Sequence, residues 1–365
     1  MKLKPIFEDV KRPVQILGPC SAETEEQVLE TARQLAENNA KVDLFRAGIW
    51  KPRTRPNSFE GIGAEGLQWL KKVREEYGFK ITTEVANAQH TYEALKAQVD
   101  VFWLGARTTV NPFSVQEVAD ALKGADVPVL VKNPINPDLK LWMGAIERLY
   151  NVGITRIGAI HRGFSKFGKS VYRNIPQWQI PLELKREFPD IEIITDASHI
   201  CGNRENLYEI SQFALDLNMD GIMLETHPTP DDAWSDAAQQ VTPKVLQENI
   251  LSKLIVRSEG ADDPLFLHNI EDLRSQIDLI DKEVIQLYAD RMNLAEKIGE
   301  FKLQNNIAIY QQGRWSDVLE RAMDKAGPLG LSETFVNRIL KAVHQESIDR
   351  QEEVMKASQG KSIEK

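Results

Sequence analysis

Strand-like and helix-like segments alternate regularly through the first 257 residues, and this alternation limits the possible folds more than any other feature. Short runs rich in Val, Ile and Leu, typical of buried parallel strands, are each followed by a helical pattern. The predicted strands are 14–19, 41–47, 80–85, 99–106, 127–133, 155–161, 191–197 and 220–226. The predicted helices are 24–39 with Thr24 as N-cap, 66–78, 90–97, 114–123, 139–153, 177–188, 204–218 and 242–257.

Eight strand–helix units in roughly 250 residues is the length expected of an α/β fold of the closed (β/α)8 type, the TIM barrel. A doubly wound parallel sheet produces the same alternation. The number of units favours the barrel, and so does the presence of polar or charged residues after every strand rather than at one switch point. We therefore expect a barrel domain over residues 1–257, with its active site at the carboxyl ends of the strands.

The strand pattern stops after residue 257. A helical pattern covers 269–303, which corresponds to a rod roughly 50 Å long. The two helices predicted after it, 313–326 and 331–357, are too short to cover its apolar stripe, so we expect the same helix of a second subunit to pack there. We predict a linker at 258–268 and an all-α, three-helix dimerising domain at 269–365.

Cationic residues recur at the ends of the predicted strands, although the chain as a whole is acidic, with 45 Lys+Arg against 54 Asp+Glu. They are Arg46, Lys51, Arg53, Arg107, Lys132 and Arg162. Positive charge concentrated in this way predicts a pocket for small phosphorylated anions. A nucleic-acid surface would carry basic residues over a whole face, so we expect no nucleic-acid partner.

Four residues of metal-ligand type also follow strands. Cys20 comes after the first strand, His199 after the seventh, Glu225 ends the eighth, and Asp236 lies further along the same loop. Each by itself has an ordinary structural interpretation, but barrel closure would place the eighth strand beside the first and the seventh. One sulfur, one imidazole and two carboxylates suit one divalent ion such as Mn, Co, Fe or Zn.

The sequence shows no pattern typical of a disulfide-rich, membrane-spanning or secreted protein, and this predicts its cellular compartment. Its two cysteines, Cys20 and Cys201, argue against a disulfide framework. No apolar run reaches the ~20 residues that span a bilayer, and the N-terminus carries charges and a proline where a signal peptide needs an apolar core. We expect a cytoplasmic enzyme with no membrane partner.

The motifs of the barrel half resemble those of the type I-beta 3-deoxy-D-arabino-heptulosonate 7-phosphate (DAHP) synthases over residues 10–257. The matching segments are LGPCSAE, FRAGIWKPRTRPNSFEG, GARTT, VKNP, HRG, DASHICG and LETHPTPDDAWSDAAQQ. The resemblance implies a barrel that condenses phosphoenolpyruvate with erythrose 4-phosphate, the first step of the shikimate pathway.

The resemblance also assigns roles. The implied metal ligands are Cys20, His199, Glu225 and Asp236; the implied phosphoenolpyruvate site is Arg46, Lys51, Arg107, Lys132 and Arg162; the implied erythrose 4-phosphate site is Pro52, Arg53 and Thr54. Lys51 is the catalytic candidate, either handling a proton near the phosphate or pairing with it. Arg55 stands where the family usually has serine. A metal-dependent aldolase of sugar phosphates, which releases no phosphate, is the alternative enzyme class.

In the helical half, Arg291 and Lys302 are 11 residues apart, close to three whole turns, and can share a face of the predicted helix that also carries Arg274. The segments LRSQIDLID, RMNLAEKIGEFK and HQESIDRQ resemble the all-helical chorismate mutases. This resemblance implies an intertwined homodimer that converts chorismate to prephenate, with pairing of dimers into tetramers left open. The implied chorismate site is Arg274 from the other subunit, Arg291 and Ser347 on the carboxylates, Lys302 and Gln351 on the ether oxygen, and Arg314 in support.

The family's usual acidic pair in this region is replaced by Gln311 and Trp315. Two hypotheses follow from the combination of halves. One is a bifunctional enzyme, DAHP synthase (a transferase) and chorismate mutase (an isomerase). The other is a synthase whose helical domain is a non-catalytic, allosteric sensor of chorismate or prephenate.

Overall fold

The computed structural model describes residues 1–51, 59–166, 168, 170–258 and 260–363, with side chains up to residue 357. The chain separates into two compact units, Met1–Glu259 and Gly260–Lys365. Cys20 and Cys201 are both buried free thiols, as the sequence predicts. No helix in the described ranges has the length and apolar character needed to cross a membrane.

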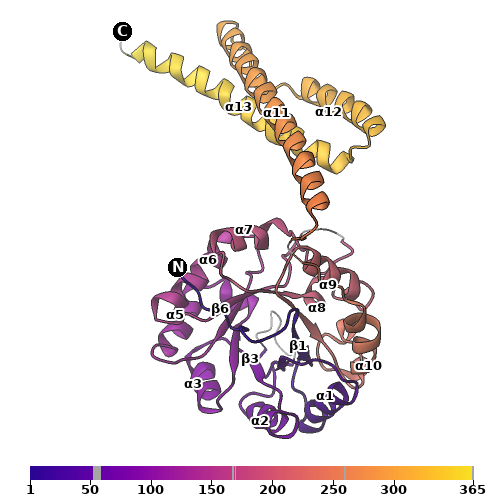
Figure 1. The fold of residues 1–365 in the computed structure, drawn as a ribbon. Coiled ribbons are helices and arrows are strands. Elements are labelled where there is room, and N and C mark those ends of the chain that lie inside the picture. Colours follow the sequence, from indigo (N-terminus) through magenta and orange to yellow (C-terminus); the bar gives the residue numbers. More distant parts are fainter. Residues whose placement is uncertain (52–58, 167, 169, 259, 364–365) are drawn as a thin grey trace. The chain divides into compact units, whose positions relative to one another are not determined.

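The first unit is a closed barrel whose described strands pair in parallel and in chain order (Figure 1). The last strand returns to the first, with Val14 opposite Gly221 and Gly18 opposite Glu225. This closure confirms the (β/α)8 barrel and excludes the doubly wound sheet. The strands are β1 (Val14–Gly18), β2 (Leu44–Arg46), β3 (Ile81–Val85), β4 (Val101–Leu104), β5 (Val129–Lys132), β6 (Ile157–His161), β7 (Ile193–Asp196) and β8 (Gly221–Glu225).

Helices surround the strands (Figure 1). They are α1 (Glu25–Glu37), α2 (Glu65–Tyr77), α3 (Ala88–Lys96), α4 (Ala106–Thr109), α5 (Pro112–Ala121), α6 (Leu139–Asn151), α7 (Gln179–Glu187), α8 (Ala197–Cys201), α9 (Leu207–Asp216) and α10 (Pro243–Val245). The Thr24 cap is confirmed, because its side chain accepts from the backbone N–H of Gln27. The short helices α4 and α8 start directly after β4 and β7 and were not predicted, since four or five residues are too few for a helical period.

The helix predicted over 242–257 ends early, at Lys253, and its turns change type along the segment. α10 passes into a π-helical turn, Leu246–Ile250, and then a 3-10 turn, Leu251–Lys253. Leu246, Ile250 and Leu251 are all buried. A wider turn lets residues five apart face one side, which explains how these side chains share the core.

Two hydrophobic clusters pack against the barrel strands, one on the inner face and one on the outer face. The strand residues Ile16, Trp103 and Met223 belong to an inner cluster that also holds Phe7 from the N-terminal segment. Glu192 fixes that segment by accepting from the backbone N–H groups of Ile6 (2.6 Å) and Phe7 (3.2 Å). A larger cluster lies between strands and helices, so the strands are buried on both faces, which is why they read as continuous apolar runs.

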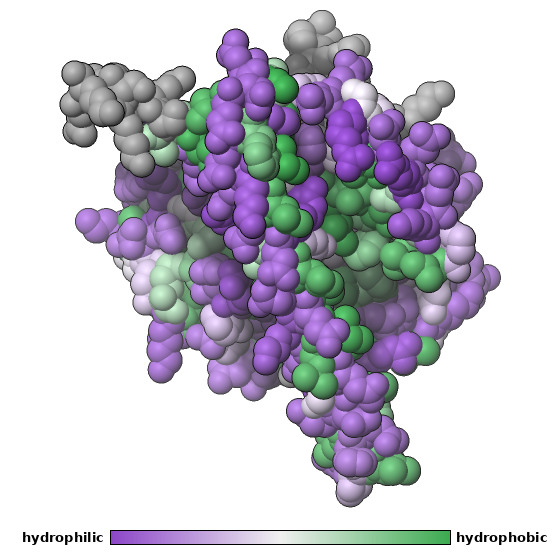
Figure 2. Space-filling view, turned by 90° about the horizontal axis from the view of Figure 1, so that it is seen from above, coloured by the Kyte–Doolittle hydropathy of each residue, from purple (hydrophilic) through white to green (hydrophobic). Residues whose placement is uncertain are grey.

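The second unit is built from α11 (Pro264–Gln304), α12 (Gln312–Ala326) and α13 (Glu333–Ile363). α11 starts five residues before the predicted 269, because Asp263 caps it by accepting from the N–H of Leu265 and Pro264 occupies its first position. α11 and α13 pack along each other. Much of the α11 stripe remains uncovered, with Ile280 58% and Leu287 65% exposed. Figure 2 shows hydrophobic residues (green) on the surface of the molecule, interspersed with hydrophilic ones (purple).

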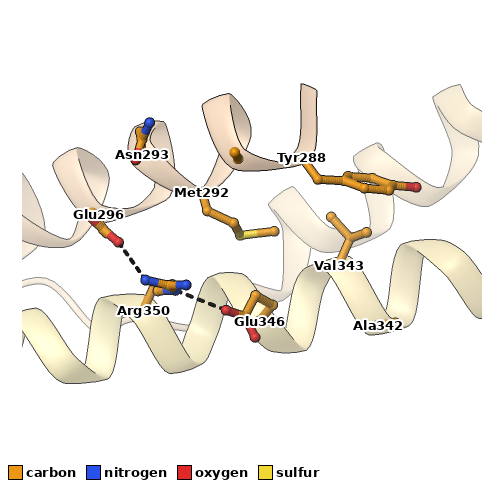
Figure 3. A pocket seen from close by; sticks show the side chains of 9 residues that line it. Tyr288, Met292, Asn293, Glu296, Ala342, Val343, Glu346 and Arg350 are labelled. Carbon is orange, nitrogen blue, oxygen red and sulfur yellow. Dashed lines mark hydrogen bonds and ion pairs between the residues drawn. The ribbon is translucent and has the colours of Figure 1, made fainter. Parts of the chain in front are cut away.

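A groove of about 370 Å³ runs between α11 and α13. Tyr288, Met292 and Val343 line it, and Arg350 bridges it by donating to Glu346 (2.9 Å) and Glu296 (3.2 Å) (Figure 3). Arg350 is the one arginine among the described lining residues, and it is already paired with two carboxylates, so this groove does not suit an anionic ligand.

Candidate functional site

Three of the four predicted metal ligands meet at the carboxyl ends of the barrel strands. Cys20 follows β1, Glu225 ends β8, and Asp236 precedes the 3-10 turn Ala237–Gln239. Their ligand atoms all lie within 4.8 Å of one another, and the Cys20 thiol donates to Asp236 Oδ2 over 3.3 Å. Glu225 Oε1 is buried and accepts no hydrogen bond from the described residues, although it forms an ion pair with Arg46 Nη2 over 3.1 Å. We call Cys20, Glu225 and Asp236 the thiol–carboxylate cluster.

His199, the fourth predicted ligand, lies beside this cluster but outside the 4.8 Å group formed by the described side chains. It is carried by α8, and its Nδ1 is 3.0 Å from Asp196 Oδ1 and 3.7 Å from Glu225 Oε1. Asp196 is the last residue of β7 and also caps α8 through the backbone N–H of His199. Sequence reasoning missed Asp196, although its position at a strand end was the signal that identified the other residues.

Two of the predicted cations contact the cluster directly. Arg46, only 1% exposed, donates to Cys20 O (3.2 Å) and pairs with Glu225 Oε1 (3.1 Å). Its Nε is buried without a hydrogen-bond partner in the described part of the chain. Lys51, half-buried, donates to Cys20 Sγ over 2.8 Å.

The remaining predicted cations of the described barrel lie after β4, β5 and β6. Lys132 is buried and donates to Asp196 Oδ2 over 2.8 Å. Arg162 receives support from Asn174, whose Oδ1 accepts from Arg162 Nη1 over 2.8 Å. Arg107 is exposed on α4 and is close enough to influence the titration of Arg162. Pro52, Arg53 and Thr54, predicted for erythrose 4-phosphate, lie with Arg55 outside the described residues.

Burial and charge perturb the groups of this site in opposite directions. Burial, assisted by Glu225, raises the pKa of the Cys20 thiol to about 12. Burial alone would raise the pKa of Glu225 and Asp236, but His199 and the cations Arg46, Lys51 and Arg173 outweigh it and lower both. Because burial lowers the pKa of His199 itself, the arginines and Lys51 supply this positive charge at neutral pH. Burial lowers the pKa of Arg162 to about 10, so this guanidinium remains charged at neutral pH. The carboxylates therefore stay ionised, and the thiol needs further positive charge to ionise.

In the helical unit, five of the six residues predicted for chorismate line one pocket of about 460 Å³, here called the helical pocket. They are Arg291, Lys302, Arg314, Ser347 and Gln351. Arg291 donates to Ser347 Oγ, Lys302 to the backbone oxygen of Ile309 (2.5 Å), and Gln351 Nε2 to the backbone oxygen of Ser347 (2.9 Å). None of the described lining residues is acidic. The cations here are not neutralised and can receive an anion.

Aromatic residues form one wall of the helical pocket. The Trp315 ring stacks on His344 with centroids 3.9 Å apart, and Tyr310 meets His344 edge-on at 6.1 Å. Burial and the charges of Arg291 and Lys302 lower the pKa of His344. Gln311 also lines the pocket. Sequence reasoning missed His344, although it lies in the quoted HQESIDRQ segment.

Arg274, the sixth predicted residue, is not among the described lining residues of the helical pocket. It is exposed on α11, 17 residues before Arg291, which corresponds to roughly 25 Å along a helix. One chain therefore cannot bring both arginines to the same pocket.

Comparison with known proteins gives a match for each unit. Residues 8–255 match the DAHP synthetase I family, and residues 273–352 match chorismate mutase type II. The phospho-2-dehydro-3-deoxyheptonate aldolase of Thermotoga maritima is 31% identical over 233 residues, 64% of this chain and 66% of that protein. The 2-dehydro-3-deoxyphosphooctonate aldolase of Wolinella succinogenes is 28% identical over 269 residues, 67% of this chain and 99% of that protein.

Two solved structures of a DAHP synthase are similar to part of this chain. The crystal structure of the Thermotoga maritima DAHP synthase superposes with a TM-score of 0.58 at 28% identity, covering 66% of this chain and 69% of that one. A truncated form of the Thermotoga synthase gives a TM-score of 0.56 at 27% identity, over 66% of this chain and 86% of that one.

Proposed function

The chain belongs to the DAHP synthetase I family and carries a type II chorismate mutase domain, and we propose that both halves are catalytic. The barrel would condense phosphoenolpyruvate with erythrose 4-phosphate to give DAHP and phosphate, and the helical domain would rearrange chorismate to prephenate. We propose domain limits of 1–257 and 269–365, joined by a linker. The thiol–carboxylate cluster, in contact with Arg46 and Lys51, is the observation that carries the barrel assignment.

The residues present fit a divalent metal ion. A buried thiol within reach of two ionised carboxylates is a donor set for a borderline ion such as Mn, Co, Fe or Zn. Among the described residues, Glu225 Oε1 makes ion-pair contacts but accepts no hydrogen bond. We propose His199 as the fourth ligand, because its Nδ1 contacts Asp196 and no described residue donates to or accepts from its Nε2. When bound, the ion would polarise the aldehyde oxygen of erythrose 4-phosphate.

The chain's own residues would bind and orient phosphoenolpyruvate. Arg107 and Arg162 bring positive charge to its phosphate, and Lys132 retains two N–H donors beyond the one given to Asp196. Lys51 lies against Cys20, where it stabilises the thiolate and the departing phosphate. The enol carbon attacks the aldehyde carbon, water adds to the former enol carbon, and phosphate leaves with cleavage of its C–O bond. Holding two anions together against their repulsion is the main contribution of the cations.

For the helical pocket, the absence of acidic groups among its described lining residues supports binding of a dianion. Arg291 and Ser347 would hold a carboxylate, while Lys302 and Gln351 would meet the ether oxygen as negative charge develops there. The rearrangement needs neither a nucleophile nor a metal, only a clamp that favours the compact transition state.

We also propose that the helical domain forms a homodimer. Arg274 is too far along α11 to reach the pocket of its own chain, and Ile280 and Leu287 leave an apolar stripe exposed. A second copy packed on this stripe would cover it and supply the missing arginine. The assembly would then be required for mutase turnover.

The decisive test of the barrel assignment is release of inorganic phosphate from phosphoenolpyruvate plus erythrose 4-phosphate, with and without a chelator. Condensation that stops on chelation and returns with Mn²⁺ supports the proposal. Turnover without phosphate release would indicate an aldolase instead. A five-carbon aldose phosphate, tested in parallel, would distinguish synthesis of an eight-carbon product from that of a seven-carbon one.

The sensor hypothesis for the helical domain is tested on the full chain by prephenate formation. Turnover that depends on Lys302 supports the mutase. Absence of turnover, together with a condensation rate that responds to added prephenate, would replace the mutase by a binding module.

A further inference from the structure

Two adjacent residues, Arg173 and Asn174, lie between the thiol–carboxylate cluster and the Arg162 phosphate site. They belong to the segment between β6 and α7, which has no periodic pattern. Their backbone N–H groups donate to Cys201 O (3.2 Å) and Ile200 O (3.1 Å), at the end of α8. The dipeptide is thus attached to the helix that carries His199.

Arg173 connects the two carboxylates of the cluster. Its Nη1 donates to Asp236 Oδ1 and to Gln239 Oε1, each over 2.9 Å. Gln239 is buried and its Nε2 donates to Glu225 Oε2 over 2.6 Å. A continuous hydrogen-bonded chain therefore runs from Asp236 through Arg173 and Gln239 to Glu225.

The backbone explains why Asp236 needs this support. It adopts a left-handed conformation, φ 50° and ψ 36°, which is strained for a residue with a side chain. The stem of Arg173 is itself held against Gly202, where an added Cβ would come within 2.4 Å of the Arg173 Cβ. Gly202 also has a positive φ of 67°, so both its conformation and its contact require glycine.

Asn174 connects Arg162, which is proposed to bind the substrate phosphate, to the helix α8. It is buried, its Oδ1 accepts from Arg162 Nη1 (2.8 Å), and its Nδ2 donates to the backbone oxygen of His199 (2.6 Å). The amide is therefore used at both ends, and it fixes the direction of the Arg162 guanidinium relative to α8.

We infer that Arg173 and Asn174 form a positioning pair, in which Arg173 holds Asp236 for the metal ion and Asn174 holds Arg162 for the substrate phosphate. This inference rests on the proposed barrel function. Residues that orient metal ligands typically change metal affinity 10–100-fold when removed. The pair should separate the two binding events: Arg173 acts on the ion and Asn174 on the anion.

The test uses metal-free full-length protein. Co²⁺ binding is followed by thiolate-to-cobalt absorbance and calorimetry, and phosphoenolpyruvate binding without metal by calorimetry. We expect Arg173→Leu to weaken Co²⁺ binding about 10–100-fold and to leave phosphoenolpyruvate affinity within about threefold. Arg173→Lys keeps the positive charge but lacks the planar guanidinium, so its Co²⁺ affinity should lie between those of the wild type and Arg173→Leu. This variant replaces Arg173→Leu in the test if the leucine variant fails to fold. Asn174→Ala should weaken phosphoenolpyruvate binding about tenfold.

Arg204 is the matched control, because it contacts the same loop through Asp231 (2.6 Å) and Ala237 O (3.0 Å) without touching the cluster. Arg204→Ala should bind Co²⁺ like the wild type. Unchanged Co²⁺ affinity in both Arg173 variants, or an equal loss in Arg204→Ala, would overturn the role of Arg173. If the wild type itself shows neither a cobalt–thiolate band nor phosphoenolpyruvate binding, the proposed barrel function fails and the pair with it.

Discussion

The barrel site and the helical pocket both collect cationic side chains, but they hold them differently. In the barrel, Arg46 and Lys132 are 1% and 5% exposed and are paired with Glu225 and Asp196. In the helical pocket, Arg291 and Lys302 are half-buried and donate to uncharged oxygen atoms. The barrel therefore mixes both signs of charge, which suits a cation beside anions, whereas the pocket offers positive charge alone, which suits a dianion.

The two sites also differ in whether one chain supplies all of their predicted residues. Closure of the barrel brings residues from β1, β7 and β8 together within one chain. In the three-helix unit, Arg274 and the exposed apolar residues Ile280 and Leu287 of α11 are not among the described residues that line the helical pocket. We therefore expect the barrel chemistry to depend on single residues, and the helical chemistry on both residues and assembly.

The largest expected effect is on the barrel side. Cys20→Ala removes the sulfur of the thiol–carboxylate cluster, so condensation should fall on the order of 10³-fold or more. Prephenate formation by the same variant should equal that of the wild type. Parallel assays of both reactions give the result, and unchanged condensation would remove Cys20 from the proposed ligand set.

The corresponding change on the helical side is Lys302→Ala. Loss of a donor aimed at developing negative charge typically costs about 10²–10³-fold in rate. Mutase turnover should drop by this amount while phosphate release in the barrel stays normal. Full prephenate production by Lys302→Ala would show that the helical pocket is not the mutase site.

A smaller effect is expected from a variant that tests whether the helical pocket needs a second subunit. Ile280→Glu places a charge on the exposed stripe of α11 and should weaken self-association. Mutase rate per chain should then fall about 10–100-fold at low protein concentration and recover at high concentration, whereas condensation does not change. Sedimentation analysis alongside both assays checks this. A monomer with full mutase activity would contradict the shared site.

The smallest effect concerns stability rather than rate. Burial lowers the pKa of His161 in the barrel from 6.5 to about 4. Because the folded pKa lies below the unfolded one, its contribution is fully present above pH 6.5 and is lost as the pH falls toward 4. The loss amounts to about 3 kcal/mol. Thermal melting of the barrel between pH 7 and 4 measures it, and His161→Gln, which keeps a donor for Pro176 O, should flatten the profile.

Much of the candidate site was predictable because strand ends are recognisable in the chain. The polar residues after β1, β2, β5, β6 and β8 were found in this way. Asp196 followed the same rule and was overlooked, whereas Arg173, Asn174 and Gln239 lie in irregular segments where no period or strand end marks them. The helix predicted over 242–257 ends early, at Lys253, and contains a buried π-helical turn that breaks the 3.6-residue period.

The amino-acid pattern by itself determined the eightfold barrel, the change to an all-helical second half and the residue types gathered at strand ends. These are local properties, since hydrophobic period and strand spacing are written along the chain. Only the tertiary structure decided which charged groups pair with one another. It placed His199 Nδ1 in hydrogen-bonding contact with Asp196. It also linked Asp236 to Glu225 by hydrogen bonds through Arg173 and Gln239. Such partners depend on distances between segments far apart in sequence, which only closure of the barrel fixes.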